Sequence, residues 1–138
     1  NTVHILIDQI RESVNIPVLS IIEETVKVLG DHNVKNIMVL GSKLTMKSHL
    51  YAKVLSNNEI DMTVPDDEKL VCDVINDLLL NKETSRLKEL SNYLSNHEIQ
   101  DILLACTDLQ IVLKHIRKKT VWDSLDILSS ATVREIFS

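Results

Sequence analysis

The most constraining feature of this sequence is the stretch Ile102–Asp108, ILLACTD, in which an apolar run stops at a cysteine followed by two polar residues. A continuous apolar run of about four to eight residues is typical of a strand buried on both faces of a parallel sheet. Apolar residues then recur at helical spacing, at Leu109, Val112, Leu113 and Ile116. The pattern predicts that Cys106 lies at the corner between a strand and a helix.

A thiol at that corner has two interpretations. Backbone amides and the dipole at a helix N-terminus stabilise a thiolate, so the position predicts a lowered pKa for Cys106. In open α/β sheets, ligands also bind at the carboxyl ends of strands. Most free cysteines, however, are small buried apolar residues, and this stretch alone leaves that alternative open.

The rest of the chain repeats the alternation of strands and helices. Further strands are expected at Asn36–Leu40, Glu59–Val64 and Thr120–Trp122. Amphipathic helices are expected over Val3–Val14, after Ser20, from Thr45, after a capping Asp66, around Leu87–Leu94 and from Ser124. The predicted fold class is α/β, with a parallel sheet flanked by helices in three layers.

Composition narrows the function classes. A formal net charge of −5 predicts no general attraction to nucleic acid or to an anionic membrane. Two glycines cannot build a glycine-rich nucleotide loop, and the five histidines form no metal-ligand motif with the cysteines. Cys72 and Cys106 lack the dense spacing of a disulfide scaffold, which favours a reducing cytoplasm. No apolar stretch is long enough to predict a transmembrane helix.

Three segments resemble motifs of the aspartate/glutamate racemase family, whose members work without pyridoxal phosphate. Ala105–Asp108, ACTD, resembles the motif around the second catalytic cysteine, usually GCTE. Asn1–His4, NTVH, resembles the NTMH or NTAH segment that directly follows the first catalytic cysteine, and Ile16–Glu23, IPVLSIIE, resembles an IPLLHIIE-type segment. The chain departs from GCTE at Ala105 and Asp108, which leaves the shape of the cleft open.

Three further segments extend the resemblance over essentially the whole chain, in the expected order. Val39–Met46, VLGSKLTM, resembles the LLGTxxTM loop, and Ile60–Asp67, IDMTVPDD, resembles IEVVVPDE. Val121–Leu128 resembles the closing VFDTLxIL segment. The chain is therefore identified as a member of this family, most similar to the aspartate racemase branch.

The resemblance implies a two-lobed, pseudo-symmetric fold in which this chain supplies the second lobe. It places the first catalytic cysteine immediately before Asn1, so we expect most of the first lobe to lie outside these residues. Residues 1–20 would end the first lobe, and residues 21–119 would form the second lobe with Cys106. Residues 120–138 would pack back toward the first lobe. A homodimer is a further expectation.

The resemblance also implies the chemistry. Two cysteines on opposite faces of an acidic amino acid would remove and return the Cα proton, with no cofactor and no metal, and Cys106 would be one of them. The implied substrate-binding residues are Asn1, Thr2, Thr45, Lys82 and Thr107. Helix capping alone would also explain the threonines, and an isolated lysine such as Lys82 is usually only solvated. His4 would orient the first cysteine or its helix.

Two alternatives remain at this stage. Related enzymes with paired cysteines include maleate isomerases and hydantoin racemases, which differ in substrate. The other alternative is a non-catalytic module that binds carboxylates and lacks the first cysteine. Aspartate and glutamate are not distinguished, because much of the side-chain pocket would belong to the first lobe.

Overall fold

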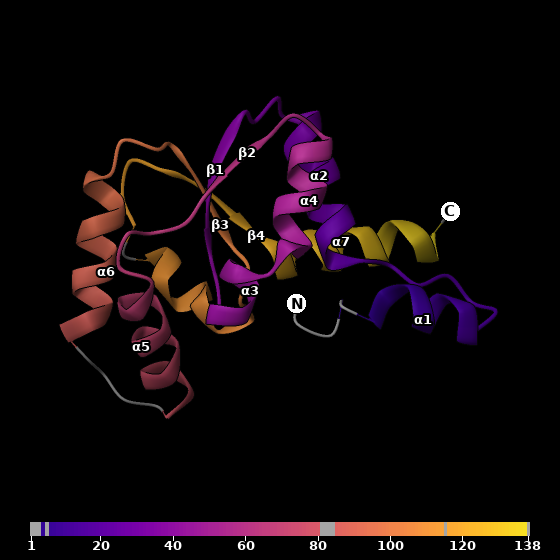
Figure 1. Cartoon of the computed structure of the whole chain (residues 1–138), viewed down its shortest axis with the longest axis horizontal. Helices are drawn as coiled ribbons and strands as arrows, with labels where there is room; N and C mark the ends of the chain where they lie inside the picture. Colours follow the sequence, from indigo (N-terminus) through magenta and orange to yellow (C-terminus); the bar gives the residue numbers. More distant parts are fainter. Residues whose placement is uncertain (1–3, 5, 81–84, 115, 138) are drawn as a thin grey trace.

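The computed structural model describes residues 4, 6–80, 85–114 and 116–137, which form a parallel sheet between two layers of helices (Figure 1). The strands are β1 (Asn36–Leu40), β2 (Asp61–Thr63), β3 (Asp101–Leu104) and β4 (Thr120–Asp123), in the spatial order β2-β1-β3-β4. Every pair is parallel, with Leu40 opposite Leu104 and Leu104 opposite Asp123. The predicted fold class is confirmed.

Successive side chains of the strands point to opposite faces of the sheet, so each face has its own apolar cluster and its own layer of helices. Ile37, Val39 and Leu103 face one side, where α2 (Ile21–Asp31), α4 (His49–Asn57) and α7 (Ser124–Ile136) pack. Met38, Leu40, Ile102 and Leu104 face the other side. There they contact α5 (Glu68–Leu79), α6 (Ser85–Asn96) and the 3₁₀ helix η2 (Thr107–Lys114). Strands buried on both faces explain the continuous apolar runs.

Local side-chain chemistry sets the element boundaries. The hydroxyl of Ser20 accepts a hydrogen bond from the Glu23 amide at 3.3 Å, so the predicted start of α2 is confirmed. The cap of α5 was wrongly placed at Asp66, because the side chain that accepts the Leu70 amide, at 2.9 Å, is that of Asp67.

The helix expected from Thr45 is divided into α3 (Lys43–Lys47) and α4. Ser48 has an extended backbone (φ −72°, ψ 148°) and its hydroxyl donates to the Thr45 carbonyl at 3.4 Å. A serine that hydrogen-bonds its own neighbouring backbone competes with the helix. The break therefore comes from Ser48, while the apolar spacing of both pieces follows the prediction.

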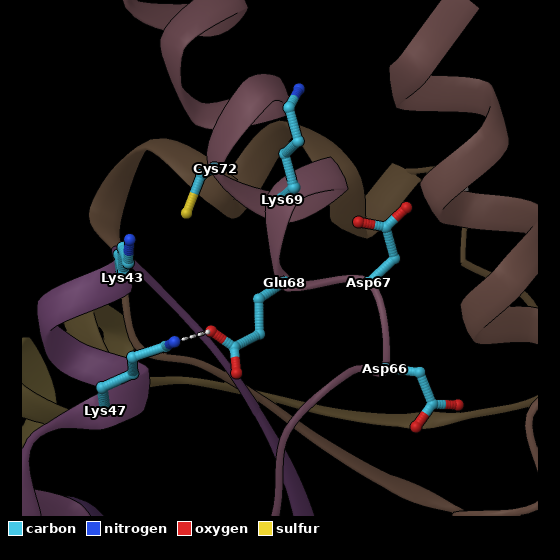
Figure 2. Close-up of a pocket in the computed structure, with 7 residues that line it drawn as sticks. All are labelled: Lys43, Lys47, Asp66, Asp67, Glu68, Lys69 and Cys72. Carbon is cyan, nitrogen blue, oxygen red and sulfur yellow. Dashed lines mark ion pairs between the residues drawn. The ribbon is translucent and has the colours of Figure 1, made fainter.

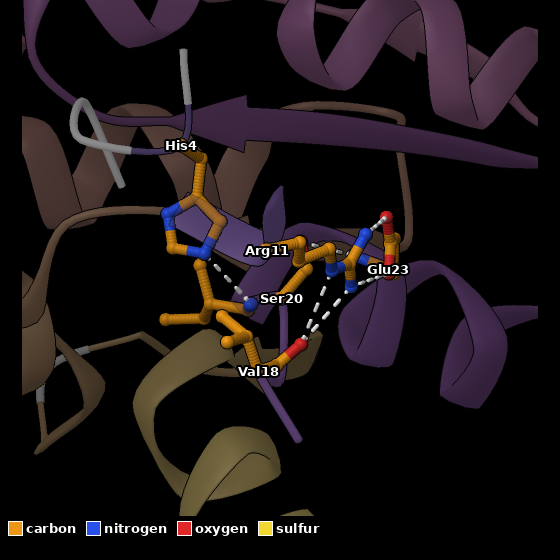
Figure 3. A network of polar contacts seen from close by, with 6 residues as sticks. His4, Arg11, Val18, Ser20 and Glu23 are labelled. Carbon is orange, nitrogen blue, oxygen red and sulfur yellow. Dashed lines mark hydrogen bonds and ion pairs between the residues drawn. The ribbon is translucent and has the colours of Figure 1, made fainter. Parts of the chain in front are cut away.

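Polar contacts hold the N-terminal helix α1 (Ile7–Ser13), which has no buried residue (Figure 3). The guanidinium of Arg11 donates to both carboxylate oxygens of Glu23, at 2.9 and 2.7 Å, and to the Val18 carbonyl at 3.1 Å. His4 Nε2 accepts the Ile21 amide at 3.0 Å, at the start of α2. The helix is thus fastened to α2 by hydrogen bonds.

The connections diverge between β1 and β3. From β1 the chain passes through α3 and then through α4, on one face, to β2, and from β3 it passes through η2, on the other face, to β4. Ligands of open α/β folds bind outside the carboxyl ends of strands where the connections diverge in this way. Within the described part of the chain, no helix is long and apolar enough to cross a membrane.

Candidate active site

The carboxyl ends of β1 and β3 bring two distant segments together. The Ala105 amide donates to the Leu40 carbonyl at 2.7 Å, which extends the pairing beyond β3. A Cβ at Gly41 would lie 3.0 Å from the Thr45 side chain and 3.4 Å from the Ala105 carbonyl oxygen. Thr45, in α3, and the corner that carries Cys106 therefore lie at the same edge of the sheet.

Cys106 is half-buried at the corner between β3 and η2. Its carbonyl accepts the Leu109 amide at 3.1 Å, which begins the 3₁₀ turn. The thiol donates to Oδ2 of Asp108, with a sulfur–oxygen distance of 3.5 Å. The thiol thus lies at a strand-to-helix corner as predicted, next to a carboxylate that accepts its hydrogen bond.

The pKa of the Cys106 thiol is raised, contrary to the prediction. Burial is the largest cause, because it disfavours the thiolate. The backbone of Asp108 does lower the pKa by hydrogen bonding, as expected at the start of a helix, but the carboxylate of the same residue raises it. At neutral pH the thiol form therefore predominates in this chain.

Thr45 is buried rather than open at this edge, with 4% of its surface exposed. Its hydroxyl lies 3.0 Å from that of Ser42, and the Ser42 hydroxyl accepts the Thr45 amide at 3.2 Å. Ser42, not Thr45, therefore caps α3. The sequence prediction overlooked Ser42 as the start of this helix, although a serine directly after a strand is a capping signal.

Of the other predicted site residues, the structure describes Thr107 but not the remaining three. Thr107 is exposed beside Cys106, at the first position of η2. Asn1, Thr2 and Lys82 lie outside the described residues.

A separate cavity of about 480 Å³ opens beside α3 and the start of α5 (Figure 2). Its lining carries both charges, and Lys47 forms an ion pair with Glu68 at 3.3 Å. Cys72 contributes its thiol and also packs against the apolar cluster of that face. None of the described predicted site residues lines this cavity. Among the described residues, no group of three or more His, Cys, Asp or Glu side chains could hold a metal ion.

Comparison with known proteins shows to which family this chain belongs. The family model of the Asp/Glu/hydantoin racemases matches residues 1–132. The chain belongs to this family. It is 31% identical to the broad specificity amino-acid racemase RacX of Bacillus subtilis (strain 168), over 96% of this chain and 60% of that protein.

Solved structures agree on the fold. An aspartate racemase homologue from Pyrococcus horikoshii OT3 superposes with a TM-score of 0.84 at 24% identity, over 100% of this chain and 64% of that one. The aspartate racemase of Picrophilus torridus gives a TM-score of 0.76 at 25% identity, over 95% and 59%. The 138 residues thus span about 60% of the length of these relatives.

Proposed function

We propose that this chain contributes one of two acid/base thiols to a cofactor-independent racemase of acidic amino acids. The observation that carries the proposal is the position of Cys106, at the carboxyl edge of the paired strands β1 and β3 and hydrogen-bonded to Asp108. Family membership adds to this, because the relatives are named as amino-acid racemases. The two-cysteine mechanism and the identity of the substrate are both part of the proposal.

In the proposed reaction, one thiolate removes the Cα proton and the thiol on the opposite face returns one. The raised pKa keeps Cys106 protonated at neutral pH, so in the unloaded chain it is ready to act as the acid. A bound substrate brings an ammonium group, and a nearby positive charge lowers a thiol pKa. In the reverse direction, the Cys106 thiolate removes the Cα proton, and the thiol so formed again donates a hydrogen bond to Asp108.

The remaining assignments belong to the same proposal. Thr107, next to the thiol, and Thr45, through its bond to Ser42, are assigned to substrate binding together with Asn1, Thr2 and Lys82. The opposite thiol is assigned to a first lobe outside these 138 residues. The division at residues 20 and 119, a homodimer and a cytoplasmic location stay predictions; β4 itself pairs with β3 in the sheet.

The test is exchange of the Cα proton with solvent deuterium, using a protein that contains this chain and the first lobe. We expect Cys106→Ser to lower exchange by about 10²- to 10⁴-fold, the usual effect of removing a general acid or base. Substrate binding, measured by calorimetry, should persist because the residues assigned to substrate binding are unchanged. Normal exchange in the variant would exclude the thiol from the mechanism.

A second candidate function is racemisation of a broader set of amino acids, favoured by the match to RacX. The same exchange assay distinguishes the two when it is run with aspartate, glutamate and a panel of neutral amino acids. A hydantoin is added to the exchange panel and conversion of maleate to fumarate is followed separately, because these substrates represent the other paired-cysteine enzymes. Exchange limited to aspartate or glutamate supports the first proposal.

A further inference from the structure

The peptide unit between Leu104 and Ala105 ends β3, one residue before Cys106, and both of its polar groups are fixed. The Ala105 amide donates to the Leu40 carbonyl of β1 at 2.7 Å. The Leu104 carbonyl accepts a hydrogen bond from the hydroxyl of Ser124 at 2.8 Å. One side of this peptide is therefore held by a backbone, and the other by a side chain.

Ser124 replaces a bond that the sheet cannot supply. Leu104 lies opposite Asp123 at the end of β4, and the chain then turns into α7. The Asp123 carboxylate caps that helix by accepting the Leu125 amide at 2.9 Å. Because the backbone has left the sheet, a side-chain hydroxyl satisfies the Leu104 carbonyl, which would otherwise be costly to bury.

Ser124 is itself held in a buried group of hydroxyls from three helices. Thr25 of α2, Tyr51 of α4 and Ser124 of α7 have no exposed surface. Tyr51 is hydrogen-bonded to Thr25 and to Ser124, and Thr25 donates to the Ile21 carbonyl at 2.6 Å. These helices pack on the same face of the sheet (Figure 1). Polar groups are rarely concentrated in an apolar layer unless every member is satisfied.

We propose that Ser124 is a positioning residue for Cys106, which fixes the last peptide of β3 and thereby the depth of the thiol at the carboxyl edge of the sheet. The role in catalysis rests on the proposed function, but the placement of the thiol does not. Loss of the hydroxyl would free the Leu104 carbonyl and loosen the corner. The thiol would become more accessible and its burial, the main cause of its raised pKa, would be reduced.

The experiment measures alkylation of Cys106 by iodoacetamide against pH in the 138-residue chain with Cys72→Ala, which leaves one thiol. In Ser124→Ala and Ser124→Val we expect the rate to rise by about three- to tenfold, the equivalent of one lost hydrogen bond. The pH midpoint should fall toward the ordinary thiol value. Ser124→Thr, which matches Val in shape and keeps the hydroxyl, should restore the parent rate and midpoint.

A matched control separates positioning from general destabilisation. Val26→Ala removes a buried side chain from the same layer, outside the hydroxyl group, and should leave rate and midpoint unchanged in the folded chain. Equal effects of Val26→Ala and Ser124→Ala, or no rescue by Thr, would overturn the proposal, as would an unchanged Ser124→Val variant. None of these outcomes depends on racemisation, so failure of the proposed function is a separate result.

Discussion

At the scale of single residues, two opposing effects act on one thiol. The start of η2 supplies a backbone amide that favours the Cys106 thiolate, as the sequence indicated, but burial and the Asp108 carboxylate act in the opposite direction and prevail. Sequence patterns place a residue at a helix start, whereas they contain no measure of how deeply the packed helices bury it. The position of Cys106 was therefore predictable and the direction of its pKa shift was not.

The predicted consequence concerns Asp108→Asn, in the Cys72→Ala chain. An amide neither carries the negative charge that opposes ionisation nor accepts the thiol proton as strongly as a carboxylate. The pKa of Cys106 should fall, so that alkylation against pH has a lower midpoint than in the parent. Asp31→Asn, at the far end of α2 on the other face, is the control and should leave the midpoint unchanged. A midpoint that does not move in Asp108→Asn would contradict the assigned cause.

At the scale of elements, β1 matches the sequence prediction and η2 does not match it in type. The segment Asn36–Leu40 is a strand with the predicted bounds, because its apolar residues are buried on both faces. The segment after Cys106 keeps helical spacing but forms a 3₁₀ helix. Its first bond joins residues three apart, from Leu109 to Cys106, and β-branched Ile111 and Val112 weaken an α-helix. Spacing alone cannot separate these two helix types.

Two glycine substitutions, one of them a control, test the packing of the turn between β1 and α3. A methyl group at Gly41 would press on the Thr45 side chain at 3.0 Å and approach the Ala105 carbonyl at 3.4 Å, and the Thr45 hydroxyl is held by that of Ser42. Gly41→Ala should lower the free energy of unfolding by about 1–3 kcal/mol, as overpacking does. Gly30→Ala, on α2 with nothing within 4 Å, should raise it by about 0.5–1 kcal/mol. Denaturant unfolding measures both changes in the free energy of unfolding. If the two substitutions change it in the same direction, the packing described at this edge is contradicted.

At the scale of the whole molecule, the described residues form a four-stranded sheet with the thiol of Cys106 at its carboxyl edge. The sequence predicted all four strands, because β1 and β3 are continuous apolar runs and the segments that contain β2 and β4 carry strand-forming residues next to helix starts. The role of Ser124 was beyond sequence reasoning, because its hydroxyl bonds the Leu104 carbonyl in a segment 20 residues away, whereas Ser42 acts on its near neighbour Thr45. The proposed second thiol, which would face Cys106 across a substrate, could likewise not be predicted from these 138 residues.

The last prediction follows from the geometry of proton transfer to a tetrahedral carbon. A group on one face of Cα can remove a proton and return it to the same face, which leaves the configuration unchanged. The 138-residue chain should therefore not interconvert the enantiomers of aspartate or glutamate, as measured by circular dichroism of the amino acid. Joining the first lobe of a relative to this chain should restore interconversion, and Cys106→Ser in that joined protein is the control that should abolish it. Interconversion by the 138-residue chain alone would mean that these residues contain both proton-transfer groups, and the division of the two thiols between lobes would be wrong.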